Sequence, residues 1–234
     1  MKVSREQVAE NRRTILEAAS RLFRERGYDS VSVAEIMKAA GLTHGGFYGY
    51  FASKDELIAG ALADVLSKRP EPTGDLADFA AGYLSAAHRD NRAGGCPTAA
   101  LAAETVRLDG EPRAEMTAGV RRQIARLSRI APGETDVQKR QVAIGSWAAM
   151  VGAMILARVS DDPVLSEEIL EQTQTWLAGD RKEQGGSIPG PVRPVRGDAA
   201  GRAGRSFQTP PGTVVERPAR PPTRGKRPGR TRTH

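Results

Sequence analysis

Apolar positions recur every three or four residues through most of the first 180 residues, and no stretch alternates with the two-residue period of a strand. From Ser4 to Arg26 the apolar residues form one stripe opposite a charged face, which predicts an amphipathic helix ended by Gly27. Similar patterns predict helices over about 33–40, from Ser53 onward, and over about 76–89, 97–108, 112–130, 137–159 and 163–178. The sequence therefore predicts an all-α protein.

Two short helices are expected to flank a tight turn between residues 32 and 50. Ser32 followed by Glu35 is the spacing of a capping box, Gly41 breaks the helix, and Thr43 is the next candidate N-cap. This helix, turn and second short helix match the helix-turn-helix layout, whose second helix enters the DNA major groove. The two consecutive glycines after His44 each cost roughly 1 kcal/mol relative to Ala in a helix. Close approach of their backbone to a phosphate or base edge is the expected compensation.

The run VSVAEIMKAAGLTHGGFYGYFASKDELIAGAL, residues 31–62, resembles the DNA-binding domain of TetR-family transcriptional regulators, and LFRERGYDSVSV upstream fits the same pattern. The resemblance covers about residues 10–66. Many members carry His where this chain has Tyr50, and Lys or another residue where it has His44, so the operator sequence does not transfer. Alternatively, Tyr48 and Tyr50 are half-buried aromatics and His44 is a solvated surface residue. The residues expected at or near the DNA are Ser32, Thr43, His44, Gly45, Gly46, Tyr48, Tyr50 and Lys54.

A second helical region follows the break at Pro70, Pro72 and Gly74. Its segment 142–157 is apolar nearly all round, which is typical of a helix that is central in a bundle or shared between subunits. Together with the last helix it predicts a four-helix interface in a homodimer, and the TetR resemblance implies the same. Alternatively, both helices only fill the core of the monomer. A twofold dimer would read a palindromic operator on double-stranded DNA.

Candidate effector-binding residues are the Met, aromatic and neighbouring side chains of this second region, because such residues line adaptable apolar pockets. A plain hydrophobic core explains the same set. The candidates are Phe79, Tyr83, Leu101, Thr105, Met116, Val120, Ile124, Trp147, Met150 and Met154.

Cys96 directly precedes a predicted helix, where the helix dipole and free N–H groups stabilise a thiolate. Some TetR-like repressors that sense electrophiles or oxidants carry a cysteine at a similar Gly-Cys helix start, so Cys96 is a candidate redox sensor. Alternatively, it is a small apolar residue that packs at a helix end.

Charge is distributed unevenly along the chain. The formal net charge is +3 over residues 1–54, −6 over 55–180 and +10 over 181–234, and the last segment holds 9 Pro and 9 Gly among its 54 residues. This composition predicts a disordered basic tail. The expected domains are 1–69 for DNA binding, 70–180 for effector binding and dimerisation, and 181–234 for the tail. The tail suggests an alternative function, which is nonspecific architectural binding of DNA.

Enzymatic activity is not expected, because the sequence contains no P-loop, dinucleotide-binding, G-x-S-x-G or H-E-x-x-H motif. One Cys and three His are few for a metal site, and no cofactor is expected. The single cysteine and the charged amphipathic N-terminus predict a cytoplasmic location. The longest uncharged run, 142–157, has 16 residues, fewer than the roughly 20 needed to span a membrane. We therefore expect a sequence-specific, homodimeric transcriptional regulator, a repressor released by a small apolar or reactive effector.

Overall fold

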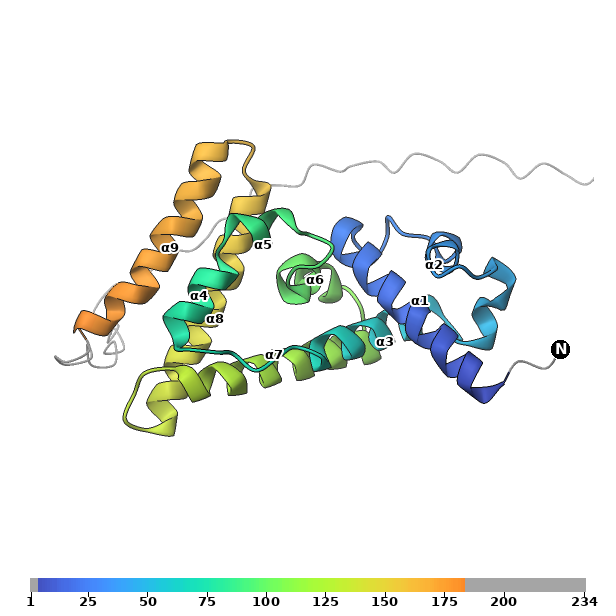
Figure 1. Ribbon diagram of the computed structural model, residues 1–234, viewed down its shortest axis with the longest axis horizontal. Coiled ribbons are helices and arrows are strands. Elements are labelled where there is room, and N and C mark those ends of the chain that lie inside the picture. The colour runs from blue at the N-terminus through green and yellow to red at the C-terminus, as the bar shows by residue number, and fades with distance from the viewer. Residues whose placement is uncertain (1–3, 184–234) are drawn as a thin grey trace, which may run out of the picture. The chain divides into compact units, whose positions relative to one another are not determined.

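The computed structural model describes residues 4–183, and this part of the chain is helical and contains no strand (Figure 1). The predicted all-α class is confirmed. Residues 184–234, which make up nearly all of the predicted tail, lie outside the described residues. The elements are α1 (Arg5–Arg26), α2 (Val33–Ala39), the 3-10 helix η1 (His44–Gly49), α3 (Lys54–Ser67), α4 (Leu76–Tyr83), α5 (Ala86–Asp90), α6 (Pro97–Thr105), α7 (Glu111–Ile130), α8 (Asp136–Val159) and α9 (Pro163–Glu183).

Side-chain caps begin the helices of the N-terminal part. The hydroxyls of Ser4, Ser32 and Ser53 each accept a hydrogen bond from the backbone N–H three residues later. At Ser32 the reciprocal bond from the backbone N–H to Glu35 is also present, so the predicted capping box is confirmed. These local bonds fix where α1, α2 and α3 start.

Gly27 ends α1 with a φ of +84°, a conformation that side chains with a Cβ rarely adopt. A Cβ at this position would also lie 2.5 Å from the Oε1 atom of Glu104 on α6. The turn after α1 therefore requires glycine both for its backbone angle and for the approach of α6.

The single helix expected over 76–89 is wrong, because the structure divides it into α4 and α5. The Ser85 hydroxyl accepts from the His88 backbone N–H and donates to the Gly82 carbonyl, so it caps a new helix. The His88 ring nitrogen Nδ1 lies 2.6 Å from the Tyr83 carbonyl oxygen, at the point where α4 ends.

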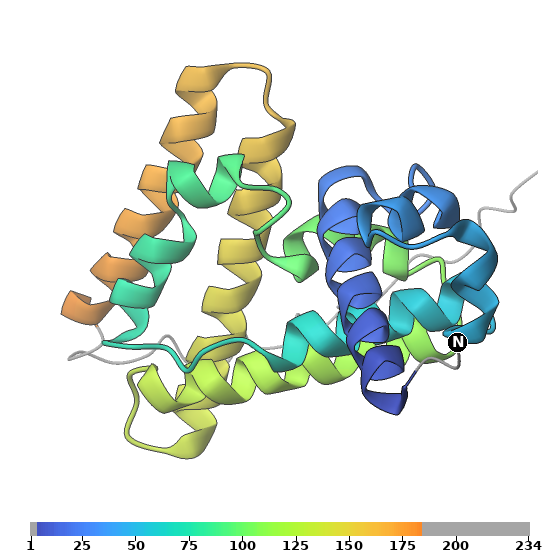
Figure 2. The same ribbon diagram turned by 45° about the vertical axis from the view of Figure 1, so that its right-hand side comes forward.

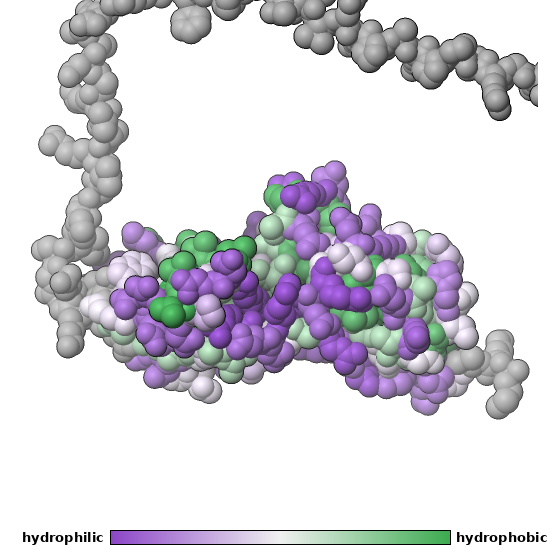
Figure 3. All heavy atoms as spheres, turned by 90° about the horizontal axis from the view of Figure 1, so that it is seen from above, coloured by the Kyte–Doolittle hydropathy of each residue, from purple (hydrophilic) through white to green (hydrophobic). Residues whose placement is uncertain are grey.

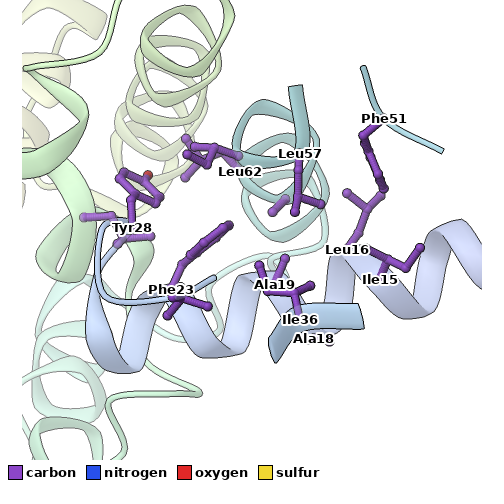
Figure 4. Close-up of a cluster of buried hydrophobic side chains, with 14 of the residues drawn as sticks. Ile15, Leu16, Ala18, Ala19, Phe23, Tyr28, Ile36, Phe51, Leu57 and Leu62 are labelled. Atoms are coloured by element: carbon purple, nitrogen blue, oxygen red, sulfur yellow. The ribbon is translucent and has the colours of Figure 1, made fainter. Parts of the chain in front are cut away.

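The first hydrophobic core joins α1, α2, η1 and α3, and its side chains point toward one another between these helices (Figure 4). Phe23, Ile36 and Leu57 are buried in it. Leu101 of α6 and Met116 of α7 belong to the same core. The N-terminal helices are thus packed directly against the helices that follow them in sequence.

The second core lies among α4, α7, α8 and α9, and Figure 2 shows α8 and α9 running side by side. Met150, Met154 and Leu170 are fully buried there. Within residues 4–183, α8 is the one helix long and apolar enough to cross a membrane by length and composition, a test that core helices also pass. It exceeds the uncharged run 142–157 because charged residues extend it at both ends.

Candidate nucleic-acid interface

The segment His44–Gly49 folds as a 3-10 helix on the surface of the first core. Phe47 is buried and stacks on Phe51 with ring centroids 5.8 Å apart, which anchors the segment. Tyr48, on the other side, is 76% exposed. The expected short helix is present, and its tight 3-10 form agrees with the low helix propensity of its three glycines.

The start of this segment presents polar side chains that make no hydrogen bond within residues 4–183. Thr43 and His44 are exposed, and the Thr43 hydroxyl makes no capping hydrogen bond. No heavy atom lies within 4 Å of the position a Cβ would take at Gly45, and the same atom at Gly46 would meet only ordinary contacts. Packing within the protein therefore does not require glycine at Gly45, whereas close approach of another molecule would.

Tyr50 is half-buried, and its hydroxyl accepts a hydrogen bond of 2.8 Å from the Asn11 side chain on α1. No described residue accepts the proton of this hydroxyl, which is left to donate outward. Asn11 was not expected from the sequence, because 39 residues separate it from Tyr50.

Ser32 is exposed, but its hydroxyl already donates to Glu35 Oε2 over 2.8 Å. Glu35 accepts hydrogen bonds from the Ser32 backbone N–H, the Ser32 hydroxyl and Arg26, and these bonds lower the pKa of its carboxyl to about 2. The carboxylate therefore stays charged beside Ser32 at neutral pH. The structure shows a capping role for Ser32, and its contact with a phosphate stays a prediction.

Lys54 donates from Nζ to the Tyr28 carbonyl, so part of its hydrogen-bonding capacity serves the fold. Tyr28 is the centre of a junction with α6: its backbone N–H donates to Glu104 Oε2 over 2.6 Å, and its hydroxyl lies 3.0 Å from Thr105 Oγ1. Burial raises the pKa of the Tyr28 phenol to about 12. This junction links the turn before α2 and the start of α3 to α6.

The predicted effector residues do not meet in one cavity. Phe79 and Tyr83 line a cavity of about 1030 Å³. Leu101 and Met116 are buried in the first core, and Thr105 is fully engaged with Tyr28 and the Leu101 carbonyl. Trp147, Met150 and Met154 are buried in the second core, Ile124 packs against that core, and Val120 is half-buried on α7. For these residues the structure favours the alternative of a hydrophobic core.

Cys96 is the N-cap residue of α6, as its predicted place before a helix required, and it is buried. Its backbone N–H donates to His88 Nε2 over 3.0 Å. Because Nε2 accepts, a neutral His88 carries its proton on Nδ1 and donates it to the Tyr83 carbonyl. Burial is the main cause that lowers the pKa of His88. Redox sensing by Cys96 stays a prediction, and burial of the thiol restricts the access of oxidants.

Within residues 4–183 no group of three or more His, Cys, Asp or Glu side chains could hold a metal ion.

Two family models match this chain. Residues 15–61 match the model described as bacterial regulatory proteins, tetR family, and residues 72–173 match the model described as tetracyclin repressor-like, C-terminal domain. The first match contains α2, η1 and the start of α3, which are the elements that present the exposed polar groups.

Curated relatives match the N-terminal part. The chain is 41% identical over 56 residues to the HTH-type transcriptional regulator AcrR of Shigella flexneri, which is 24% of this chain and 26% of that protein. It is 41% identical over 63 residues to the HTH-type transcriptional regulator TtgR of Pseudomonas putida, 27% of this chain and 30% of that protein. The matched stretches thus span about a quarter to a third of these relatives.

Solved structures resemble a larger share of the chain. A TetR transcriptional regulator from Chloroflexus aurantiacus is similar with a TM-score of 0.59 and 26% identity, over 76% of this chain and 97% of that one. The reduced form of E. coli NemR is similar in fold, with a TM-score of 0.59 and 24% identity over 73% of this chain and 96% of that one.

Proposed function

This chain belongs to the TetR family of bacterial regulatory proteins, and from that premise we propose that it represses transcription as a homodimer bound to a palindromic operator. A helix-turn-helix regulator of this family binds DNA. The observation that carries the proposal is the exposed, unpaired polar start of η1 on a rigidly packed support. We assign the protein a role in the regulation of transcription and no catalytic activity. We also propose that it acts in the cytoplasm.

Each exposed group of η1 has a distinct task in the proposal. His44 lies at the N-terminal turn, where side chains of a recognition helix meet base edges, and it reads sequence. The hydroxyls of Thr43, Tyr48 and Tyr50 donate to phosphates, and the bare backbone at Gly45 and Gly46 lets the DNA approach closely. Ser32 and Lys54 lie at the starts of α2 and α3, where free N–H groups favour phosphate.

Exposed apolar side chains on α8 and α9 support the proposed homodimer. Figure 3 shows apolar surface gathered over the part of the molecule where these helices lie. Trp176 is 55% exposed although Leu170 and Leu177 on the same helix are buried, so α9 has apolar residues on two faces. A second copy of the chain would cover the outer face. The exposed residues are Val137, Ile144, Ile155, Leu156, Val159, Val164, Leu165 and Trp176.

Effector control is proposed to act through α6. One end of this helix begins at Cys96 beside the cavity lined by Gly94 and Gly95, and the other end holds Tyr28 through Glu104. A movement of α6 relative to α1 would therefore shift the support of η1 and α3. A ligand that binds more tightly when the spacing of the two DNA-binding domains of the dimer does not match the operator must weaken operator binding.

Gly45→Ala in the full-length protein tests the proposed interface. We expect the added methyl to weaken binding to the operator, identified by selection from random duplex DNA, at least about tenfold. The unfolding temperature should be unchanged or higher, since Ala suits a helix better than Gly. Gly82→Ala on α4 is the matched control, because no heavy atom lies within 4 Å of its Cβ position either and it lies outside the proposed DNA and dimer surfaces. Equal operator affinity for Gly45→Ala and Gly82→Ala would contradict the proposal.

A further inference from the structure

The cavity of about 1030 Å³ has cationic side chains on several of its sides. Arg24 comes from α1, Arg69 from the segment after α3, and Arg126 from α7. These three residues are far apart in the sequence and converge only in the fold.

The positive charge of Arg24 and Arg69 is not neutralised by the residues around them. Both guanidinium groups donate to the same carbonyl, that of Gly95, over 2.9 and 3.4 Å. Within residues 4–183 neither makes an ion pair with a carboxylate. Burial, followed by the repulsion of Arg69, lowers the pKa of the Arg24 guanidinium. Two like charges are therefore held together without a counterion.

Arg126 is also short of partners. Its nearest carboxylate, Glu71, lies 3.8 Å from Nε and is closer to Arg129, at 3.0 Å. The side chain is only 12% exposed, and Nε is buried with no hydrogen-bond partner. Burial is again the main cause that lowers the pKa of this guanidinium, with Arg69 and Arg129 contributing repulsion.

The acidic residues at the cavity have other partners. Lys68 contacts Asp64 at 2.7 Å and Glu17 at 3.9 Å, and Asp78 accepts from the Asp75 backbone N–H as part of the α4 cap. The whole lining has five cationic side chains (Arg21, Arg24, Lys68, Arg69 and Arg126) and four carboxylates (Glu17, Asp64, Glu71 and Asp78), so its formal net charge is +1.

Two buried hydroxyls on the cavity lining add unused hydrogen-bonding capacity. Ser20 and Tyr83 are each 6% exposed, and neither hydroxyl oxygen has a hydrogen-bond partner among the described residues. The Tyr83 hydroxyl lies near the Cys96 thiol without hydrogen-bond geometry to it. Buried polar groups are normally paired, and all three residues with such an unpaired atom, Ser20, Tyr83 and Arg126, line this one cavity, which favours a polar group in its occupant.

An apolar wall accompanies these polar groups. The Phe79 ring stacks on Tyr83 with centroids 6.1 Å apart, and Val65, Pro70 and Pro72 also line the cavity. An occupant that satisfies both parts of the lining carries an anionic group and an apolar body.

We propose that this cavity binds a small organic anion, a carboxylate or phosphate ester whose charged group meets Arg24, Arg69 and Arg126 and whose body packs on Phe79. This inference rests on the proposed effector-responsive function and names the chemical class of the effector. The anion competes with the Gly95 carbonyl for Arg24 and Arg69. Because Gly95 directly precedes Cys96 at the start of α6, binding alters the same helix that holds Tyr28.

Calorimetric titration of the full-length protein tests the proposal with phenylacetate, octanoate and phenyl phosphate, and with phenylacetamide as the uncharged match. We expect saturable binding of at least one anion and none of the amide. Preference for phenyl phosphate over the two carboxylates identifies a phosphate ester, and the reverse order identifies a carboxylate. Binding of the amide as tightly as the acid, or of no anion, overturns the proposal.

Arg126→Gln and Arg69→Gln are the test variants, and Arg122→Gln is the matched control because Arg122 is exposed on the same helix as Arg126 and does not line the cavity. We expect each test variant to weaken anion binding at least about tenfold and the control to leave it unchanged. Unchanged affinity in both test variants refutes the site. Operator binding is measured alongside: if the unmodified protein binds no anion but prefers one DNA sequence, this inference alone fails, whereas anion binding without any preferred DNA fails the proposed function alone.

Discussion

The buried bond between Tyr28 and Thr105 permits a quantitative prediction about the junction of α1 with α6. The Thr105 hydroxyl has one proton, which it donates to the Leu101 carbonyl over 2.8 Å, so the Tyr28 hydroxyl must be the donor to Thr105 Oγ1. Tyr28→Phe removes this donor and leaves no unpaired proton, which costs about 1 kcal/mol of unfolding free energy. Thr105→Val leaves the Tyr28 hydroxyl without an acceptor. Because Tyr28 is only 3% exposed, this unpaired donor costs about 2 kcal/mol of unfolding free energy.

The double variant removes both groups and leaves neither orphaned, so its loss should fall short of the sum of the single losses by at least about 1 kcal/mol. Urea unfolding gives the unfolding free energies of the parent, the two single variants and the double variant. All four are measured at one fixed protein concentration, since the stability of a dimer depends on concentration. Thr117→Val is the control, because its hydroxyl makes the same bond to the carbonyl four residues earlier but is exposed. Losses that add within about 0.3 kcal/mol would refute the assigned donor and acceptor.

Three further predictions concern stability and assembly. Gly27→Ala should lower the unfolding free energy by about 1 to 2 kcal/mol in thermal or urea denaturation, because φ is +84° and the new Cβ meets Glu104. A stability within 0.3 kcal/mol of the parent would contradict this. In the unfolded chain His88 takes up a proton near its ordinary pKa of 6.5, whereas in the folded protein its pKa is lower. Stability should therefore fall as the pH drops from 6.5 to 5.5, by at most about 1 kcal/mol, and this dependence should vanish in His88→Gln. Trp176→Asp should shift the full-length protein toward monomer in sedimentation velocity, whereas Val106→Asp, at a 61% exposed apolar residue outside α8 and α9, should not.

Features that depend on neighbouring residues were predictable from the sequence. The capping box at Ser32 and the start of α3 at Ser53 need only side chains within one helical turn. The exposed start of η1 also followed from local order, since Thr43, His44 and the glycines are adjacent in the chain. The break between α4 and α5 was missed, because the short-range bonds of Ser85 competed with a helical apolar pattern that continued through it.

Long-range features had no sequence signal. The bond from Tyr28 to Glu104 joins residues 76 apart, and the charged cavity brings together Arg24, Arg69 and Arg126. Each arginine alone is typical of a solvated surface, and only the packing of α1 and α7 against α3 shows that they share one space. The choice between pocket and core for the apolar effector candidates stayed open in the sequence for the converse reason, because Met150 or Met154 in a core has the same sequence pattern as in a pocket.

The central claim is that residues 43–50 recognise a DNA sequence. Selection from a pool of random duplex DNA at two salt concentrations tests it, with the full-length protein and its His44→Ala variant compared side by side. We predict that the parent recovers one palindromic motif at both concentrations and that the variant recovers an altered or weaker motif. Retention of unselected DNA by both proteins, falling steeply with salt, would contradict the claim and assign DNA binding to the basic segment 184–234 instead.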